Sequence, residues 1–285
     1  MEKVKLIECP RDAMQGLKDF IPTDVKVRYL NELLKAGFHT IDIGSFVSPK
    51  AIPQLADTAE VLARIDTTAT KSKLLVIVAN ERGAEEAVKQ GSVTYLGYPF
   101  SISETFQQRN TNTSIEGSWS RIARIAEITR AGGKELVVYI SMAFGNPYGD
   151  PWSADVALHW VNRLTSELGV RIIALSDTVG VARPGDISSM FSALVRALPA
   201  IEFGAHLHCT PDNWKLKTDA AWDAGCRRFD GAIKGYGGCP MAEDELVGNL
   251  QMEVFARSLV QRGVVAGLDL AQLDRCVAEA GRVFP

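Results

Sequence analysis

The chain has 285 residues and a mass of 31.0 kDa, a length that suits two average domains or one (β/α)8 barrel. Hydrophobic residues make up 46% of the chain and charged residues 23%, a composition that excludes wholesale disorder. The net charge is −3 and no Lys/Arg tract is present, which argues against an extended nucleic-acid-binding surface.

Eight short apolar runs predict β-strands. In chain order they cover residues 4–9, 40–46, 74–79, 93–98, 136–142, 171–176, 203–209 and 228–234. Helical spacing lies between them, over residues 24–36, 115–131, 154–168, 185–198 and 212–224. Several of these helices end at a glycine that fits a C-cap, among them Gly37, Gly132, Gly169 and Gly225.

This alternation of strands and helices predicts parallel strands joined by right-handed crossovers, and eight units predict a closed (β/α)8 (TIM) barrel of the α/β class. An open doubly wound sheet is the alternative, but no G-x-G-x-x-G follows the first strand. Residues 250–285 add a short C-terminal helical extension. No linker is evident, so we expect one domain over residues 1–285, with the extension packed on the barrel.

The sequence also predicts where the protein is found. No apolar run approaches the ~20 residues of a membrane span, and no export or transit signal is evident. Five scattered cysteines, an odd number, do not suggest a disulfide framework. We therefore expect a cytoplasmic protein without membrane or nucleic-acid partners. The apolar segment 250–265 is a candidate homodimer surface.

Polar side chains gather where the predicted strands end, which is the working face of such barrels. These side chains are Arg11, Asp12, Gln15, Asp42, Ser45, Asp177, His206, His208, Cys239 and Asn249. Most of the chemistry that the chain can offer is therefore expected on one face.

The pair His206 and His208 predicts a metal site. Residues i and i+2 of a strand point to the same side, about 7 Å apart, so two imidazoles can converge on one ion. Asp12 and the amide of Asn249 would add oxygen ligands, a set that suits Mg²⁺, Mn²⁺ or another divalent ion better than a structural zinc. The plainer alternatives are two histidines on a solvated strand end and an Asn249 that caps a helix or turn.

Arg11 and Cys239 could act beside that ion. Arg11 and Asp12 are neighbours that can point differently, so the guanidinium can reach a substrate oxygen; a surface Arg–Asp pair is the alternative. Cys239 lies in a glycine-rich loop without a base beside it in the sequence. This favours acid/base work over a nucleophilic role, with simple packing also open.

Taken together, these motifs resemble the 3-hydroxy-3-methylglutaryl-CoA (HMG-CoA) lyase family, part of a metal-dependent barrel superfamily that also contains isopropylmalate, homocitrate and citramalate synthases. The matching segments are residues 8–12 with Gln15, 45–50, 53–54, 103–104, 108–110, 176–180, 206–208, 237–240 and 248–249. The resemblance therefore runs along nearly the whole chain.

The resemblance implies cleavage of an acyl-CoA, HMG-CoA or a close analogue, to acetyl-CoA and acetoacetate, a reaction of leucine degradation. By analogy Asp12, His206, His208 and Asn249 hold the divalent ion, Arg11 polarises the thioester carbonyl, His206 takes part in proton transfer and Cys239 acts as an acid. Asp42 is expected to act with Arg11. Gln15, Ser45 and Asp177 are expected to contact the substrate.

Two residues depart from the family pattern. Asp42 stands where the family usually has Glu, which predicts a displaced or water-bridged contact with Arg11. Cys209 replaces the usual Asp after the histidine pair, which predicts altered support of the ligands. Two other functions stay open. One is a Claisen-type synthase that condenses acetyl-CoA with a 2-oxo acid, although only a short tail follows Asn249; the other is a catalytically silent barrel.

Overall fold

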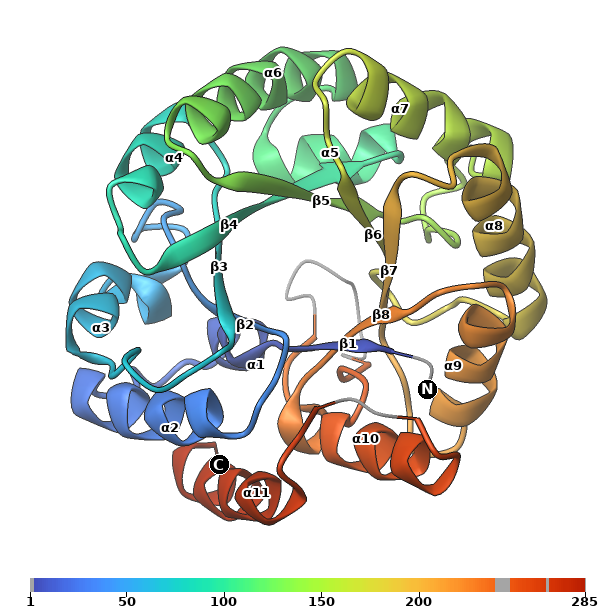
Figure 1. Cartoon of the computed structure of the whole chain (residues 1–285). Coiled ribbons are helices and arrows are strands. Elements are labelled where there is room, and N and C mark those ends of the chain that lie inside the picture. The colour runs from blue at the N-terminus through green and yellow to red at the C-terminus, as the bar shows by residue number, and fades with distance from the viewer. Residues whose placement is uncertain (1–2, 239–246, 265–266, 285) are drawn as a thin grey trace.

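Eight parallel strands close into a barrel in sequence order, with β8 paired to β1 (Figure 1). The structure, a computed structural model, describes residues 3–238, 247–264 and 267–284. The strands are β1 (Lys5–Glu8), β2 (Thr40–Ser45), β3 (Lys73–Ile77), β4 (Val93–Ser101), β5 (Glu135–Ser141), β6 (Ile172–Asp177), β7 (Glu202–Leu207) and β8 (Arg228–Gly231). The predicted (β/α)8 barrel is confirmed, and the open sheet is wrong.

The longer helices surround the barrel as an outer ring, and the short helices α1 and α5 lie inside this ring in the view of Figure 1. The described helices are α1 (Pro10–Gln15), α2 (Thr23–Lys35), α3 (Thr58–Arg64), α4 (Glu81–Val88), α5 (Glu104–Thr111), α6 (Ile115–Ala131), α7 (Ala154–Ser166), α8 (Pro184–Ala197), α9 (Trp214–Asp223), α10 (Met252–Gln261) and α11 (Leu270–Val283), with 3₁₀ turns η1 (Pro53–Leu55) and η2 (Ile233–Gly235). No described helix is both long and apolar enough to cross a membrane.

Most predicted boundaries hold to within a few residues, and the differences have local causes. The last predicted strand, 228–234, stops at Gly231 because Lys234 takes a left-handed φ of 59° inside the turn η2. Gly169 and Gly225 take the positive φ expected just past a helix end. At the end of α6, Gly132 keeps φ −79° and the next residue, Gly133, takes the positive φ instead.

The barrel interior is apolar on one side and polar on the other. A cluster of inward side chains from β3 to β6 is apolar or aromatic: Leu75, Ile77, Tyr95, Val137, Tyr139, Ile172 and Ala174. Asp42 pairs in register with Leu75 and so shares its face, while β7 and β8 add His206 and Asp230 in register with each other. The buried charged side chains of this interior, Asp42, Arg228 and Asp230, thus lie with His206 on the side formed by β7, β8, β1 and β2.

Helices α10 and α11 close the ring beside β1 and α2 (Figure 1). Phe255 of α10 packs on Phe229 of β8 with ring centroids 4.9 Å apart, and Glu279 of α11 pairs with Arg28 of α2 at 2.7 Å. In residues 250–264, the large apolar side chains of Met252 and Leu259 are buried against the chain's own barrel, whereas Val260 is 48% exposed, so the homodimer surface stays a prediction.

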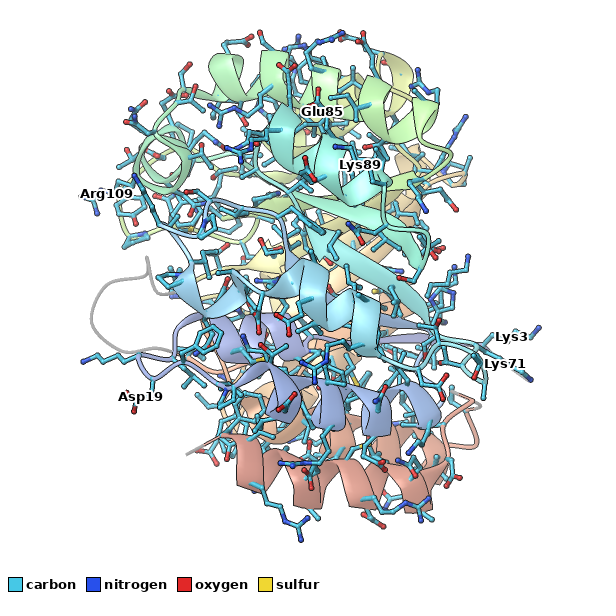
Figure 2. The ribbon with its side chains drawn as sticks, turned by 90° about the vertical axis from the view of Figure 1, so that its left-hand side faces the viewer. Lys3, Asp19, Lys71, Glu85, Lys89 and Arg109 are labelled. Carbon is cyan, nitrogen blue, oxygen red and sulfur yellow. The ribbon has the colours of Figure 1, made fainter. Side chains whose placement is uncertain are left out.

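The two ends of the barrel are distinct (Figure 2). Arg109 and Asp19 lie at the end where loops lead from strands to helices, and Lys3 and Lys71 lie at the opposite end. Because the carboxyl ends of parallel strands meet at one edge, the side chains predicted to act together share the first of these ends.

Candidate active site

The expected metal-ligating residues lie together at the carboxyl end of the barrel. Asp12 sits in the first turn of α1, His206 near the end of β7 and His208 just beyond it. The ligand atoms of these three residues lie within 4.8 Å of one another. All three residues are buried. The interpretation of two solvated histidines is therefore wrong.

The charge states of Asp12 and His208 suit a cation. Burial, and then the charge of His206, lower the pKa of His208 to about 4, so its ring is neutral and can bind a metal ion. Burial acts to raise the pKa of Asp12, but Arg11, the two histidines and the hydrogen bond from Asn249 together outweigh it and the pKa is lowered, so Asp12 is ionised. One carboxylate and two imidazoles fit a divalent ion.

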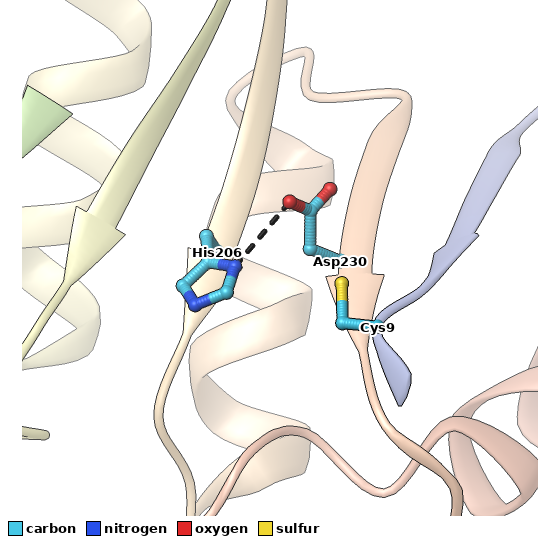
Figure 3. Close-up of side chains that lie close together, drawn as sticks. All are labelled: Cys9, His206 and Asp230. Carbon is cyan, nitrogen blue, oxygen red and sulfur yellow. Dashed lines mark hydrogen bonds and ion pairs between the residues drawn. The ribbon is translucent and has the colours of Figure 1, made fainter. Parts of the chain in front are cut away.

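Asp230 is a partner of His206 that the sequence analysis missed. Its Oδ2 lies 3.3 Å from Nδ1 of His206 (Figure 3). Burial acts to lower the pKa of His206, but Asp230 outweighs it and the pKa is raised. A carboxylate on one ring nitrogen fixes the ring and leaves the other nitrogen for the ion. The sequence places Asp230 in the last predicted strand, but only the packing of β8 shows that it points inward.

A second group of ligand types lies deeper, formed by Cys9, His206 and Asp230 (Figure 3). The thiolate is the form that binds metals, and burial followed by the charge of Asp230 raises the pKa of Cys9 well above its usual value. The thiol instead lies 3.7 Å from the carbonyl of Ile7 and donates to it. Geometry and charge therefore favour the Asp12 side of His206 for a divalent ion.

Arg11 is buried in a network of hydrogen bonds. Its Nε and Nη2 donate to Oδ2 of Asp42 at 3.0 and 2.6 Å, and its Nη1 donates to Asp12 and to Gln15, both at 2.9 Å. Burial acts to lower its pKa, but the two carboxylates outweigh it and the pKa is raised. Arg11 is only 8% exposed, so the surface-pair alternative is wrong.

Asp42 reaches Arg11 directly, in spite of being shorter than the usual glutamate. One carboxylate oxygen accepts from both Nε–H and Nη2–H of Arg11, so the expected displaced or water-bridged contact with Arg11 is wrong. Oδ1 of Asp42 has no hydrogen-bond partner among the described residues. Burial raises the pKa of Asp42 to about 6, against the lowering effect of Arg11.

Gln15 and Asn249 hold the carboxylate of Asp12 from two sides. Nε2 of Gln15 donates to Oδ1 of Asp12, and Nδ2 of Asn249 donates to Oδ2, each at 2.6 Å. Gly237 packs against this pair with φ +97°; a Cβ there would lie 2.7 Å from Nδ2 of Asn249 and 2.8 Å from the carbonyl oxygen of Asp12. The backbone at Gly237 can therefore lie this close to Asp12 and Asn249 only because the residue has no side chain.

Ser45 and Asp177 lie at strand ends as predicted, but both are bonded to the protein itself. The hydroxyl of Ser45 donates to the carbonyl of Ile77 at 3.3 Å. Asp177 accepts from the ammonium of Lys217 at 2.6 Å, another partner that the sequence analysis missed. Cys239 lies outside the described residues.

The usual Asp at position 209 was expected to support the histidine ligands. Cys209 makes no hydrogen bond to the ring of His206 or His208. Its thiol donates to the carbonyl of Leu207 at 3.6 Å, and burial raises its pKa to about 12. Its backbone N–H donates to Gly248 at 2.9 Å, next to Asn249. Support of the histidine pair therefore comes from Asp230 and from the backbone.

Comparison with known proteins decides the family. The model of the HMGL-like family matches residues 3–278. The chain belongs to the HMGL-like family.

Relatives of this HMGL-like chain are enzymes. Mitochondrial hydroxymethylglutaryl-CoA lyase of Mus musculus is 34% identical over 95% of the chain and 83% of the relative. The cytoplasmic 3-hydroxy-3-methylglutaryl-CoA lyase of Rattus norvegicus is 34% identical over 98% of the chain and 80% of the relative. An Acinetobacter baumannii HMG-CoA lyase, solved with coenzyme A and 3-methylmalate, has a TM-score of 0.90 at 30% identity, over 98% of this chain and 90% of that one. The resemblance expected from the motifs is confirmed.

Proposed function

We propose that this chain is a divalent-metal-dependent carbon–carbon lyase that cleaves HMG-CoA, or a close 3-hydroxyacyl-CoA analogue, to acetyl-CoA and acetoacetate. The observation that carries this proposal is the buried trio Asp12, His206 and His208 beside the guanidinium of Arg11. Retro-Claisen cleavage requires deprotonation of a tertiary hydroxyl and a cation facing the enolate that forms. The site offers a candidate for each requirement.

Asp12, His206, His208 and Asn249 would hold the ion, which supplies a Lewis acid that lowers the pKa of the substrate hydroxyl. Asp230 keeps the Nδ1 side of His206 occupied and so directs Nε2 toward the substrate end of the barrel. His206 is also our candidate for a part in the proton transfer.

Arg11 would stabilise the negative charge that develops on the thioester oxygen. Asp42 and Asp12 hold its guanidinium in place before substrate arrives, so little reorganisation is needed during the reaction. We propose that Cys239 protonates the enolate carbon. Gln15, through its contact with Arg11, is the best placed of the three expected substrate contacts.

The finer statements rest on the resemblance and on the chemistry of the donors. Oxygen and nitrogen ligands favour Mg²⁺ or Mn²⁺. A role in leucine degradation, a cytoplasmic location and a homodimer remain predictions. One domain over the whole chain is likewise our proposal, supported by the packing of α10 and α11 on the barrel.

Product analysis tests the reaction type. Purified protein with Mn²⁺ and HMG-CoA should release equal amounts of acetoacetate and acetyl-CoA, with no free thiol. Acetyl-CoA with a 2-oxo acid should give no thiol release. Thiol release that depends on the 2-oxo acid would identify a synthase instead. Absence of both reactions, together with absence of metal binding, would indicate a silent barrel.

A further inference from the structure

Lys217 is a buried lysine behind the candidate metal site. It lies in α9, and its side chain is 3% exposed. An ammonium group has three donors, and all three are used: Asp177 Oδ2 at 2.6 Å, the carbonyl of His208 at 2.8 Å and the carbonyl of Gly180 at 2.9 Å. A solvated helix lysine would not give up water for such a position unless these partners replaced it.

The three acceptors come from two segments at the carboxyl end of the barrel, the end of β6 with its loop and the end of β7. Asp177 ends β6, Gly180 belongs to the loop that follows, and His208 follows β7. Lys217 therefore joins two neighbouring strand ends to α9. Asp177 is fixed at the same time by the backbone N–H of Ala182, which donates to its Oδ1 at 3.0 Å.

The loop that Lys217 holds also supports the other side of His208. A Cβ at Gly180 would lie 2.8 Å from Cβ of Val247, so the loop packs closely on the segment that leads to Asn249. His208 is hydrogen-bonded to the backbone of Val247 and forms an isolated antiparallel bridge with Asn249. A displacement of the Lys217 ammonium would therefore shift two expected metal ligands, His208 and Asn249.

We propose that Lys217 is a positioning residue that fixes the backbone of His208, and through the loop at Gly180 the segment carrying Asn249, so that both side chains face the ion. This inference rests on the proposed function, which supplies the ion. The contacts of Lys217 do not depend on it. Replacing a residue that supports a metal ligand lowers the metal affinity about 10- to 100-fold.

Two readouts test the role of Lys217. Imidazole signals of ¹⁵N-histidine-labelled, metal-free protein can be resolved because the chain has only 4 histidines. In Lys217→Met the His208 signals should shift or broaden, and the affinity for Mn²⁺ measured by calorimetry should fall about 10- to 100-fold. Lys215→Met, two residues away on the same helix and with a side chain that is 60% exposed, is the matched control and should match the wild type in both.

Lys217→Met leaves the carboxylate of Asp177 buried without its cation, so the variant could fail to fold. The double variant Lys217→Met/Asp177→Asn removes both charges and should recover the melting temperature but not the Mn²⁺ affinity or the His208 signals. Wild-type His208 signals and affinity in a folded Lys217 variant would overturn the inference. Wild-type protein that binds no Mn²⁺ would overturn the proposed function, while the His208 signals would still decide the role of Lys217.

Discussion

His206 belongs to two groups of candidate metal ligands, one with Asp12 and His208 and one with Cys9 and Asp230. Asp230 occupies Nδ1, which leaves Nε2 for an ion held with Asp12 and His208. The alternative group with Cys9 needs a thiolate, yet burial keeps the pKa of that thiol well above its usual value.

Two substitutions separate these alternatives. Asp230→Asn should weaken Mn²⁺ binding about tenfold or more, because the ring of His206 loses the carboxylate that orients it. Cys9→Ala should change the Mn²⁺ affinity less than about twofold in the same calorimetric titration. If Cys9→Ala abolished binding and Asp230→Asn did not, the ion would lie in the deeper group.

Some residues of the site could be identified from the sequence, and others could not. The sequence identified Asp12, His206 and His208, because strand alternation and a position at a strand end can both be predicted from it. Asp230 and Lys217 were not identified, since a carboxylate in a strand and a lysine in a helix are ordinary surface residues until the packing of β8 and α9 is known. Their burial comes from long-range contacts.

At the scale of elements, the end of β1 is tied to the β8 side of the barrel by Glu8. Oε1 accepts from the backbone N–H of Ile233 at 3.0 Å, while Oε2 has no partner among the described residues. Burial raises the pKa of Glu8 well above its usual value, so the folded protein holds a proton there that the unfolded chain has released.

Glu8→Gln should therefore alter how stability depends on pH. Wild-type stability falls as pH rises from the unfolded pKa, about 4.3, toward the raised folded pKa, by up to about 1.4 kcal/mol per pH unit for one proton. Glutamine keeps the acceptor and carries no charge, so the advantage of the variant in urea unfolding should grow with pH.

The exposed Glu85 of α4, labelled in Figure 2, supplies the control for this measurement. Glu85→Gln should run parallel to the wild type across the same pH range. A Glu8→Gln protein that is less stable than the wild type by the same amount at every pH would show that Glu8 is not held protonated.

The elements themselves were largely predictable. Strands of the barrel are short apolar runs bounded by turn residues, and their parallel order follows from the helices between them. Helix α1 was harder, because Pro10–Gln15 is too short for a periodic pattern. It matters because it brings Arg11, Asp12 and Gln15 onto one hydrogen-bonded turn.

At the scale of the whole molecule, the barrel separates an apolar half from a polar half, and the site is built where the polar half reaches the loops. Three of its carboxylates, of Asp12, Asp42 and Asp177, stand against the positive charges of Arg11 and of one expected divalent ion. The structure adds Asp230 and Lys217, one negative and one positive group, so the balance of charge around the ion is kept. Such a site is near neutral before substrate binds and can stabilise negative charge on oxygen.

The central claim is that the trio of Asp12, His206 and His208 holds the ion on which HMG-CoA cleavage depends. The most direct measurement is acetoacetate formation by chelator-treated protein as Mn²⁺ is added back, for the wild type and for His208→Ala. We predict no activity without metal, recovery at about one ion per chain in the wild type, and at least a 100-fold loss in His208→Ala at the same Mn²⁺ concentration. Metal-independent cleavage, or full recovery in His208→Ala, would contradict the account.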